Sequence, residues 1–286
     1  MSDALNIKNL NKSYKEFALK NVSFALPKGY IMGFVGPNGA GKTTTIKSIL
    51  NMVGYESGEI TLLGKNTKDN DVMLNDRVGV VMDAPFYVND WTVADVEKAV
   101  APFYSKWNAA AYDGYLRRFH ISKNKKLKEL SRGMKMKLMT AVALSNSAKL
   151  LILDEPTSGL DPVARAELCE LLLEFVEDEQ NSVLFSTHIT SDLEKIADYI
   201  SFILNGEIVF TGLKEELMEK YAIVKGGKKE LQQIPKGMLI GLRNYSTGFE
   251  ALAETVRLKE LPRGVNAEAV SLEELIVFMN KEASKL

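Results

Sequence analysis

A glycine-rich turn between a strand-like and a helix-like segment constrains this chain more than any other feature of its sequence. Residues 36–44 read Gly-Pro-Asn-Gly-Ala-Gly-Lys-Thr-Thr, which fits the pattern G-x-x-x-x-G-K-[ST]. An apolar run from Tyr30 to Val35 precedes the turn, and a helix-like run from Thr43 to Met52 follows it. In a P-loop, which has this order of elements, successive backbone N–H groups and the positive end of the helix face one concavity. The sequence therefore predicts a site for a nucleoside triphosphate.

Two residues of the loop have distinct predicted roles. Lys42 is expected to reach the β- and γ-phosphates, and the Thr43 hydroxyl is expected to ligate Mg²⁺. Further contacts to the nucleotide are predicted along the loop, at Gly36, Asn38, Gly39, Ala40, Gly41 and Thr44. A glycine turn that binds nothing is the alternative interpretation, and the flanking strand and helix patterns argue against it.

The composition is that of an ordinary globular protein without a strong electrostatic partner. Of its 286 residues, 46% are hydrophobic and 26% are charged, and the net charge is −1. This balance argues against nucleic acid as a purely electrostatic partner. No apolar run approaches the ~18 residues that span a bilayer, and the first residues lack the pattern of a signal peptide. We therefore expect a cytoplasmic protein.

Strand-like and helix-like segments alternate along most of the chain. Strands are predicted within residues 5–10, 22–26, 58–64, 78–82, 182–186 and 199–204. The continuous apolar run from Leu150 to Leu153 is typical of a central parallel strand, which is buried on both faces. Residues 92–147 have helical spacing, so we expect a helical block inserted into an α/β sheet. After residue 221, a capping box at 271–274 predicts a final helix in a small α/β appendage.

Two adjacent carboxylates follow the predicted central strand. The strand delivers Asp154 to its carboxyl end, where it is expected to join Thr43 at the Mg²⁺. Glu155 is the next residue and is suited to polarise the attacking water as a general base. Two solvated acids at the end of a strand are the alternative interpretation.

Four further segments occur in a particular order around these two motifs. Residues 130–134, Leu-Ser-Arg-Gly-Met, precede the central strand, and residues 158–161, Ser-Gly-Leu-Asp, follow it. His188 stands at the end of the next predicted strand, and Tyr14 precedes a strand at 19–24. The order, spacing and strand contexts of these segments resemble those of ATP-binding cassette (ABC) ATPases over residues 3–220.

The resemblance implies a fold class and a domain organisation. The fold would be α/β, a P-loop NTPase of the ABC ATPase type with an antiparallel β subdomain, an inserted α-helical subdomain and a small C-terminal α/β appendage. The ABC ATPase domain would span residues 1–220, with the helical subdomain at about 84–148. The accessory domain would span residues 221–286.

The resemblance also implies a site that two chains share. In ABC ATPases, the residues that match Ser131 and Gly133 in one subunit close on the γ-phosphate that the other subunit holds. ATP would therefore join two such subunits head to tail, with Mg²⁺ as the second cofactor. Tyr14 would stack on the adenine, and Asp161 would belong to the D-loop beside the nucleotide. The catalytic residues would be Lys42, Glu155 and His188.

Three positions depart from the ABC pattern. Arg132 and Met134 replace a glycine and a glutamine of the signature, whereas the phosphate-contacting serine and second glycine are present. Asp83 stands where the family has the glutamine of the Q-loop. A carboxylate there adds negative charge near the predicted metal. Asp83 is therefore interpreted either as a metal-site residue, with Thr43 and Asp154, or as a strand-end acid that faces solvent.

Aromatic residues follow Asp83 in the segment that borders the permease-binding groove in ABC transporters. Phe86, Tyr87 and Trp91 would be anchors for a membrane subunit if they are exposed, and core residues of the helical block if they are buried.

The resulting hypothesis is the ATPase subunit of an ABC transporter whose permease is a separate membrane chain. The signature form and the tail resemble bacterial ATPases for export of drugs, bacteriocins and peptides. The subunit would lie at the inner face of the membrane through its permease and would bind no nucleic acid. The alternative is a soluble ABC ATPase that acts in translation or on DNA. About ninety residues separate Lys42 from Ser131, too few for the long coiled coil of the DNA-associated type.

Overall fold

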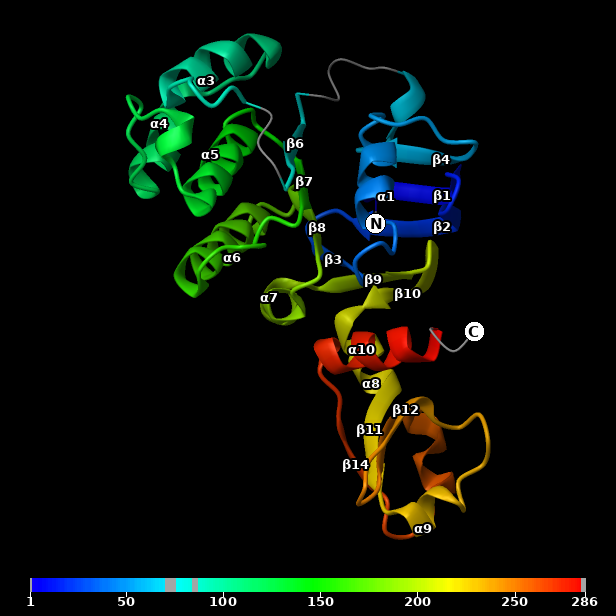
Figure 1. The fold of residues 1–286 in the computed structure, drawn as a ribbon. Helices are drawn as coiled ribbons and strands as arrows, with labels where there is room; N and C mark the ends of the chain where they lie inside the picture. The colour runs from blue at the N-terminus through cyan, green and yellow to red at the C-terminus, as the bar shows by residue number, and fades with distance from the viewer. Residues whose placement is uncertain (1, 70–75, 84–86, 284–286) are drawn as a thin grey trace.

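A six-stranded sheet forms the centre of the molecule (Figure 1). The computed structural model describes residues 2–69, 76–83 and 87–283. The strand order is β10-β9-β3-β8-β7-β6, and all neighbours are parallel except β9 and β10. The strands are β3 (Ile31–Val35), β6 (Val78–Val81), β7 (Leu150–Asp154), β8 (Ser182–Thr187), β9 (Tyr199–Leu204) and β10 (Glu207–Leu213). Every residue of β3, β7 and β8 is buried, as their apolar sequences predict.

A second sheet, which is antiparallel, packs on one side of this centre. Its order is β2-β1-β4-β5, with β1 (Asp3–Ser13), β2 (Ala18–Pro27), β4 (Ser57–Leu62) and β5 (Lys65–Asn66). Helix α1 (Lys42–Ile49) lies between the two sheets (Figure 1). Ile46 of α1, Leu5 of β1 and Ile152 of β7 belong to one buried apolar cluster. This packing fixes the start of α1, and with it the glycine-rich loop, against both sheets.

Helices fill the chain between β6 and β7. They are α3 (Val93–Val100), α4 (Ala109–Arg118) and α5 (Arg132–Leu144), with short 3₁₀ turns at Ala101–Phe103 and Leu127–Glu129. Val93, Tyr112 and Leu138 belong to a separate apolar cluster at the centre of these helices. The opposite face of α5 packs on the central sheet through Met136 and Met139. Helix α5 is thus the element that joins the helical block to the sheet.

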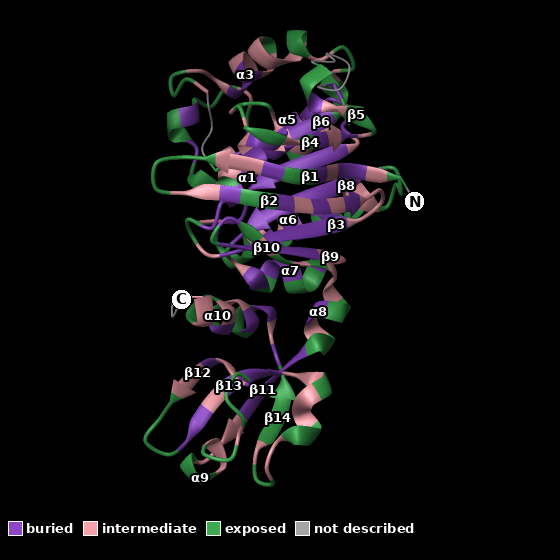
Figure 2. Ribbon diagram, turned by 90° about the vertical axis from the view of Figure 1, so that its right-hand side faces the viewer, coloured by how far each residue is buried: buried purple, intermediate pink, exposed green. Residues whose placement is uncertain are grey.

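The last part of the chain forms a third sheet. Helices α6 (Pro162–Val176), α7 (Thr190–Ile196) and α8 (Lys214–Lys220) lead to it. Its order is β12-β13-β11-β14, with β11 (Tyr221–Gly226), β12 (Ile240–Asn244), β13 (Phe249–Glu254) and β14 (Asn266–Ala269), and the short helix α9 (Lys228–Leu231) and a 3₁₀ turn at Thr255–Glu260 complete it. Apart from β10, the strands of the central sheet are buried along most of their length, whereas β14 is exposed (Figure 2).

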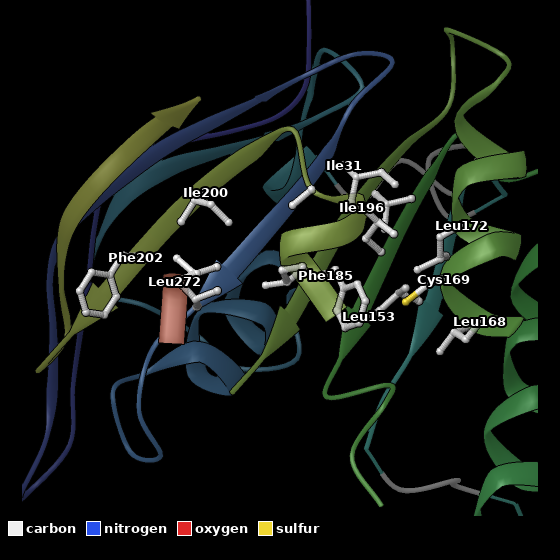
Figure 3. Close-up of a cluster of buried hydrophobic side chains, with 14 of the residues drawn as sticks. Ile31, Leu153, Leu168, Cys169, Leu172, Phe185, Ile196, Ile200, Phe202 and Leu272 are labelled. Atoms are coloured by element: carbon white, nitrogen blue, oxygen red, sulfur yellow. The ribbon is translucent and has the colours of Figure 1, made fainter. Parts of the chain in front are cut away.

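Helix α10 (Leu272–Ala283) lies between this third sheet and the main body (Figure 1). Its first turn is capped as predicted, because Ser271 Oγ accepts from the Glu274 N–H at 3.2 Å while the Glu274 carboxylate accepts from Ser271 N–H at 2.9 Å. Leu272 is fully buried in the same cluster as Phe202 of β9 (Figure 3). The tail is therefore folded onto the central sheet.

The structure confirms the predicted fold class, an α/β P-loop NTPase core with an antiparallel sheet, inserted helices and a small C-terminal α/β part. All predicted strands are present, with ends that differ by up to four residues. The domain boundaries at residues 84, 148 and 220 stay predictions. None of the helices in the described residues has both the length and the hydropathy of a membrane span.

We expect Leu272→Ala to lower the free energy of unfolding by about 2–5 kcal/mol, because it leaves a cavity between α10 and the central sheet. The matched control is Val277→Ala on the same helix, where the side chain is 40% exposed and the loss should stay within about 0.5 kcal/mol. Equilibrium unfolding in urea measures both. Equal losses in the two variants would contradict the packing of α10 described above.

Candidate nucleotide-binding site

The glycine-rich loop connects the carboxyl end of β3 to the start of α1. Two of its glycines stand where no side chain fits. A Cβ at Gly36 would lie 2.3 Å from the Ile203 carbonyl oxygen, and a Cβ at Gly41 would lie 2.6 Å from Leu19 Cδ2. Gly41 also has a φ of 111°, in the left-handed region that side chains disfavour. These contacts explain why the first and last glycines of the motif are fixed, and they leave the loop N–H groups at the helix start, as phosphate binding requires.

Lys42 is the first residue of α1 and is buried. Its ammonium donates to the Gly36 carbonyl at 2.7 Å and to the Pro37 carbonyl at 3.4 Å, so the side chain curls back over the loop. Its third partner is Glu155, with 3.4 Å between Nζ and Oε1. A buried ammonium needs such partners.

Asp154 ends β7 and is almost fully buried. It lies in register with Ser186 of β8, whose hydroxyl donates to Asp154 Oδ1 at 3.1 Å. The exposed Thr43 hydroxyl also hydrogen-bonds to Asp154. Burial raises the pKa of the Asp154 carboxyl, and these two hydrogen bonds lower it less than burial raises it. Carboxylate and hydroxyl oxygens are the ligands that Mg²⁺ prefers, so Asp154 and Thr43 fit that ion.

Glu155 connects Lys42 to His188. Its backbone has a φ of 53°, and its N–H donates to the Ser186 carbonyl at 2.9 Å. Its Oε2 lies 2.7 Å from His188 Nδ1 and 3.3 Å from the His188 backbone nitrogen. An ionised carboxylate only accepts, so Nδ1 of His188 carries the shared proton. The three predicted catalytic residues, Lys42, Glu155 and His188, are therefore in contact.

The other predicted nucleotide contacts lie at the starts of other elements. Ser131 caps α5 and accepts from the Met134 N–H at 3.2 Å, and Gly133 lies in the first turn of that helix. Asp161 caps α6 by accepting from the Val163 and Ala164 N–H groups, both at 3.0 Å. These hydrogen bonds, chiefly that from Ala164, lower the pKa of the exposed Asp161 carboxyl.

Tyr14 lies in the turn between β1 and β2. Its ring is 48% exposed, with Lys12 Nζ 5.0 Å from the ring centre. Its N–H donates to the Phe17 carbonyl at 2.7 Å, and Phe17 Cζ would lie 2.8 Å from a Cβ at Gly41. The exposed tyrosine is thus tied to a residue that packs on the glycine-rich loop.

Asp83 is engaged with Arg132. Its Oδ1 accepts from Arg132 Nη2 at 2.6 Å, and both side chains are more than half exposed. No three acidic, histidine or cysteine side chains within the described residues converge as a metal-holding group. Sequence reasoning missed both this ion pair and the role of Ser186. The position of Ser186 at the end of the strand before His188 is the signal that could have found it.

The fold and these contacts define a P-loop nucleotide-binding protein, and comparisons with known proteins narrow the class. A family described as "ABC transporter" matches residues 19–158. The "Lantibiotic transport ATP-binding protein SrtF" of Streptococcus pyogenes is 36% identical over 217 residues, which cover 72% of this chain and 89% of the relative. The "Bacitracin transport ATP-binding protein BcrA" of Enterococcus faecalis is 32% identical, over 73% of this chain and 69% of the relative.

Solved structures agree with these relatives. One described as the ATP binding subunit of an ABC transporter has a TM-score of 0.66 and 28% identity, and the match covers 75% of this chain and 91% of that one. The cbiO1 protein of Clostridium perfringens, described as part of the ABC transporter complex cbiONQ, has a TM-score of 0.65 and 26% identity over 76% of this chain and 91% of its own. The chain belongs to the ABC transporter family, as an ATP-binding subunit with ATPase activity.

Neutralising the two aspartates of this region should change stability in opposite directions. The folded state raises the pKa of Asp154, so its charge destabilises the fold at neutral pH, and Asp154→Asn should raise the melting temperature of the nucleotide-free protein. About 1 kcal/mol corresponds to about 2–4 °C in a chain of this size. The folded state lowers the pKa of Asp161, so Asp161→Asn should lower the melting temperature slightly. Thermal unfolding at pH 7.5 without nucleotide or Mg²⁺ measures both, and a lower value for Asp154→Asn would contradict the burial argument.

Proposed function

We propose that this chain is the ATPase subunit of an export transporter and that it acts on a separate membrane permease. The observation that carries the proposal is the contact of Lys42, Glu155 and His188 beside the buried Asp154. Relatives named for transport of a lantibiotic and of bacitracin support export of an antimicrobial peptide or a similar compound. The alternative of a soluble ABC ATPase that acts in translation or on DNA finds no support among these relatives.

The loop and Lys42 bind the phosphates of ATP in this proposal. The backbone N–H groups at the start of α1 and the Lys42 ammonium supply the donors. Thr43 and Asp154 would hold Mg²⁺, which when bound neutralises charge on the phosphate oxygens. Burial of Asp154 keeps water away from its carboxylate and strengthens its attraction for a cation. Asp83 is not assigned to the metal in this proposal, because its carboxylate is paired with Arg132.

Glu155 acts as the general base, and its partners control when it can do so. The carboxylate is shared between Lys42 and His188. When Lys42 turns to phosphate oxygens, Glu155 loses one cation and becomes a better proton acceptor for the attacking water. His188 keeps the carboxylate oriented through Nδ1 and its backbone N–H. Binding of the nucleotide thus prepares the base.

A second ATPase subunit completes the site in this proposal. Ser131 and Gly133 lie in the exposed to half-buried start of α5, a helix of thirteen residues whose N-terminal end attracts an anion. The γ-phosphate held by the facing subunit is the ligand that the resemblance assigns to them. Asp161 and the loop before it would lie at the same junction. Each subunit would then contribute its glycine-rich loop to one nucleotide site and its Ser131 and Gly133 to the other.

The permease is the other proposed partner, and the structure changes which residues are candidates to contact it. Tyr87 and Trp91 are half-buried and pack on the helical cluster, so they are core residues and not exposed anchors. Burial raises the pKa of Tyr87 to about 12. The expected role of Phe86 lies outside the described residues. Val88 is 52% exposed in the same segment and is the apolar residue that we assign to the permease contact.

We expect Glu155→Gln to lower the ATPase rate by about 10²-fold or more, because the general base is lost, while ATP binding persists. The variant should accumulate as an ATP-bound dimer in size-exclusion chromatography with Mg²⁺. Glu273→Gln, on the exposed start of α10, is the control and should hydrolyse ATP at the wild-type rate. Wild-type hydrolysis by Glu155→Gln, or a monomer with ATP when every partner subunit is present, would refute the mechanism.

We expect Val88→Asp to reduce co-purification with the co-expressed permease by about tenfold, because it places a charge in an apolar contact. ATP binding should not change, since Val88 makes no part of the glycine-rich loop. Val256→Asp is the matched control, because Val256 is 74% exposed in the 3₁₀ turn after β13. Equal permease recovery with the Val88 variant and the wild type would exclude this contact.

A further inference from the structure

Two of the three departures from the ABC pattern, Arg132 and Asp83, contact each other. Arg132 stands in the signature where the family has glycine, and Asp83 stands where the family has glutamine. Forty-nine positions separate them in the sequence, yet Arg132 Nη2 lies 2.6 Å from Asp83 Oδ1. The cation of Arg132, next to Ser131, is thus neutralised by the anion of Asp83, which lies just after β6.

Arg132 also reaches the loop that follows β7. Its Nη2 lies 3.4 Å from Ser158 Oγ, and its Cδ and Nε lie 3.1 Å from the place of a Cβ at Gly159. Gly159 therefore leaves room for the arginine to cross this loop. One guanidinium touches the segments after β6 and β7, which are neighbouring parallel strands. The first residue of α5 is in this way joined to two loops at the carboxyl edge of the central sheet.

Other ion pairs hold the helical block to the same part of the molecule. Lys137 of α5 pairs with Glu167 of α6, and Arg118 of α4 pairs with Glu174 of α6. These two pairs hold the middle of α5 and the end of α4. The Arg132–Asp83 pair holds the start of α5, where Ser131 and Gly133 lie.

We propose that Asp83 and Arg132 are a positioning pair that fixes the start of α5, and so Ser131 and Gly133, on the loops after β6 and β7. The pair is exposed and adds little to the stability of the fold. Its effect is on orientation, because a rotation of α5 about its contact with the sheet would break the ion pair first. The catalytic consequence rests on the proposed function, whereas the orientation itself does not.

The experiment compares four variants. They are Asp83→Asn, Arg132→Gln, the combination of these two, and a charge exchange in which Asp83→Arg and Arg132→Asp are made together. The control pair is Asp90 and Lys128, which are also 2.6 Å apart and exposed but both lie within the helical block. Asp90→Asn and Lys128→Gln therefore remove a similar pair that does not bridge to the sheet.

The first measurement is hydrogen exchange of the full chain without nucleotide, read over the start of α5. Here the amides of Met134 and Lys135 bond to Ser131 at 3.2 Å and 2.9 Å. We expect exchange about threefold faster in both single variants. The double variant should show no further increase, the charge exchange should partly restore the wild-type rate, and the control variants should show no change. Wild-type exchange in both single variants would overturn the proposal, and this result does not depend on ATPase activity.

The second measurement is ATP hydrolysis as a function of ATP and of Mg²⁺. We expect kcat to fall about five- to tenfold in each single variant, with no further fall in the double variant. The charge exchange should recover part of the wild-type kcat. The KM for ATP and the half-saturating Mg²⁺ concentration should not change in any of these variants. A severalfold rise in half-saturating Mg²⁺ with Asp83→Asn would make Asp83 a metal ligand instead. Additive losses without recovery would make Arg132 a nucleotide contact. A wild-type chain without ATPase activity would refute the proposed function. The hydrogen-exchange result would then alone test whether Asp83 and Arg132 position the start of α5.

Discussion

The site depends on the parallel register of β3, β7 and β8, because this register brings the segments that follow the three strands to one edge of the sheet. The glycine-rich loop follows β3, Asp154 and Glu155 stand at the end of β7, and His188 follows β8. Asp154 lies opposite Ser186, and the Glu155 N–H bonds to the Ser186 carbonyl. A shift of one residue would turn Asp154 to the opposite face of the sheet. The continuous burial of these strands makes such a shift unfavourable.

The sequence predicts the parts of the site whose chemistry is local. The loop glycines, Lys42 and Asp154 occur in short motifs with a fixed relation to one strand, so their place follows from the strand. The contact between Asp83 and Arg132 could not be predicted, because it depends on how α5 packs on β6. The left-handed φ of Glu155 could not be predicted either, since glutamate has no preference for it.

The C-terminal part of the chain shows the same limit on predicting the fold from the sequence. The capping box at Ser271 predicts α10 because the signal lies within four residues. The strand β14 reads Asn-Ala-Glu-Ala, has no β-branched or aromatic residue and is fully exposed. It is a strand because β11 offers it an antiparallel partner, from Ala222 opposite Ala269 to Lys225 opposite Asn266. Pairing with a neighbour overrides the weak propensity of the segment.

The stability of the folded chain depends on whether a nucleotide occupies its site. A left-handed glutamate costs about 1 kcal/mol or more, and the buried charge of Asp154 adds to that cost. A ligand that binds only the folded state offsets such a cost by RT ln(1 + [L]/Kd), about 2.7 kcal/mol at a hundredfold excess over Kd. A cell with depleted ATP would therefore hold a less stable form of this protein, and the depletion would favour its unfolding and proteolysis.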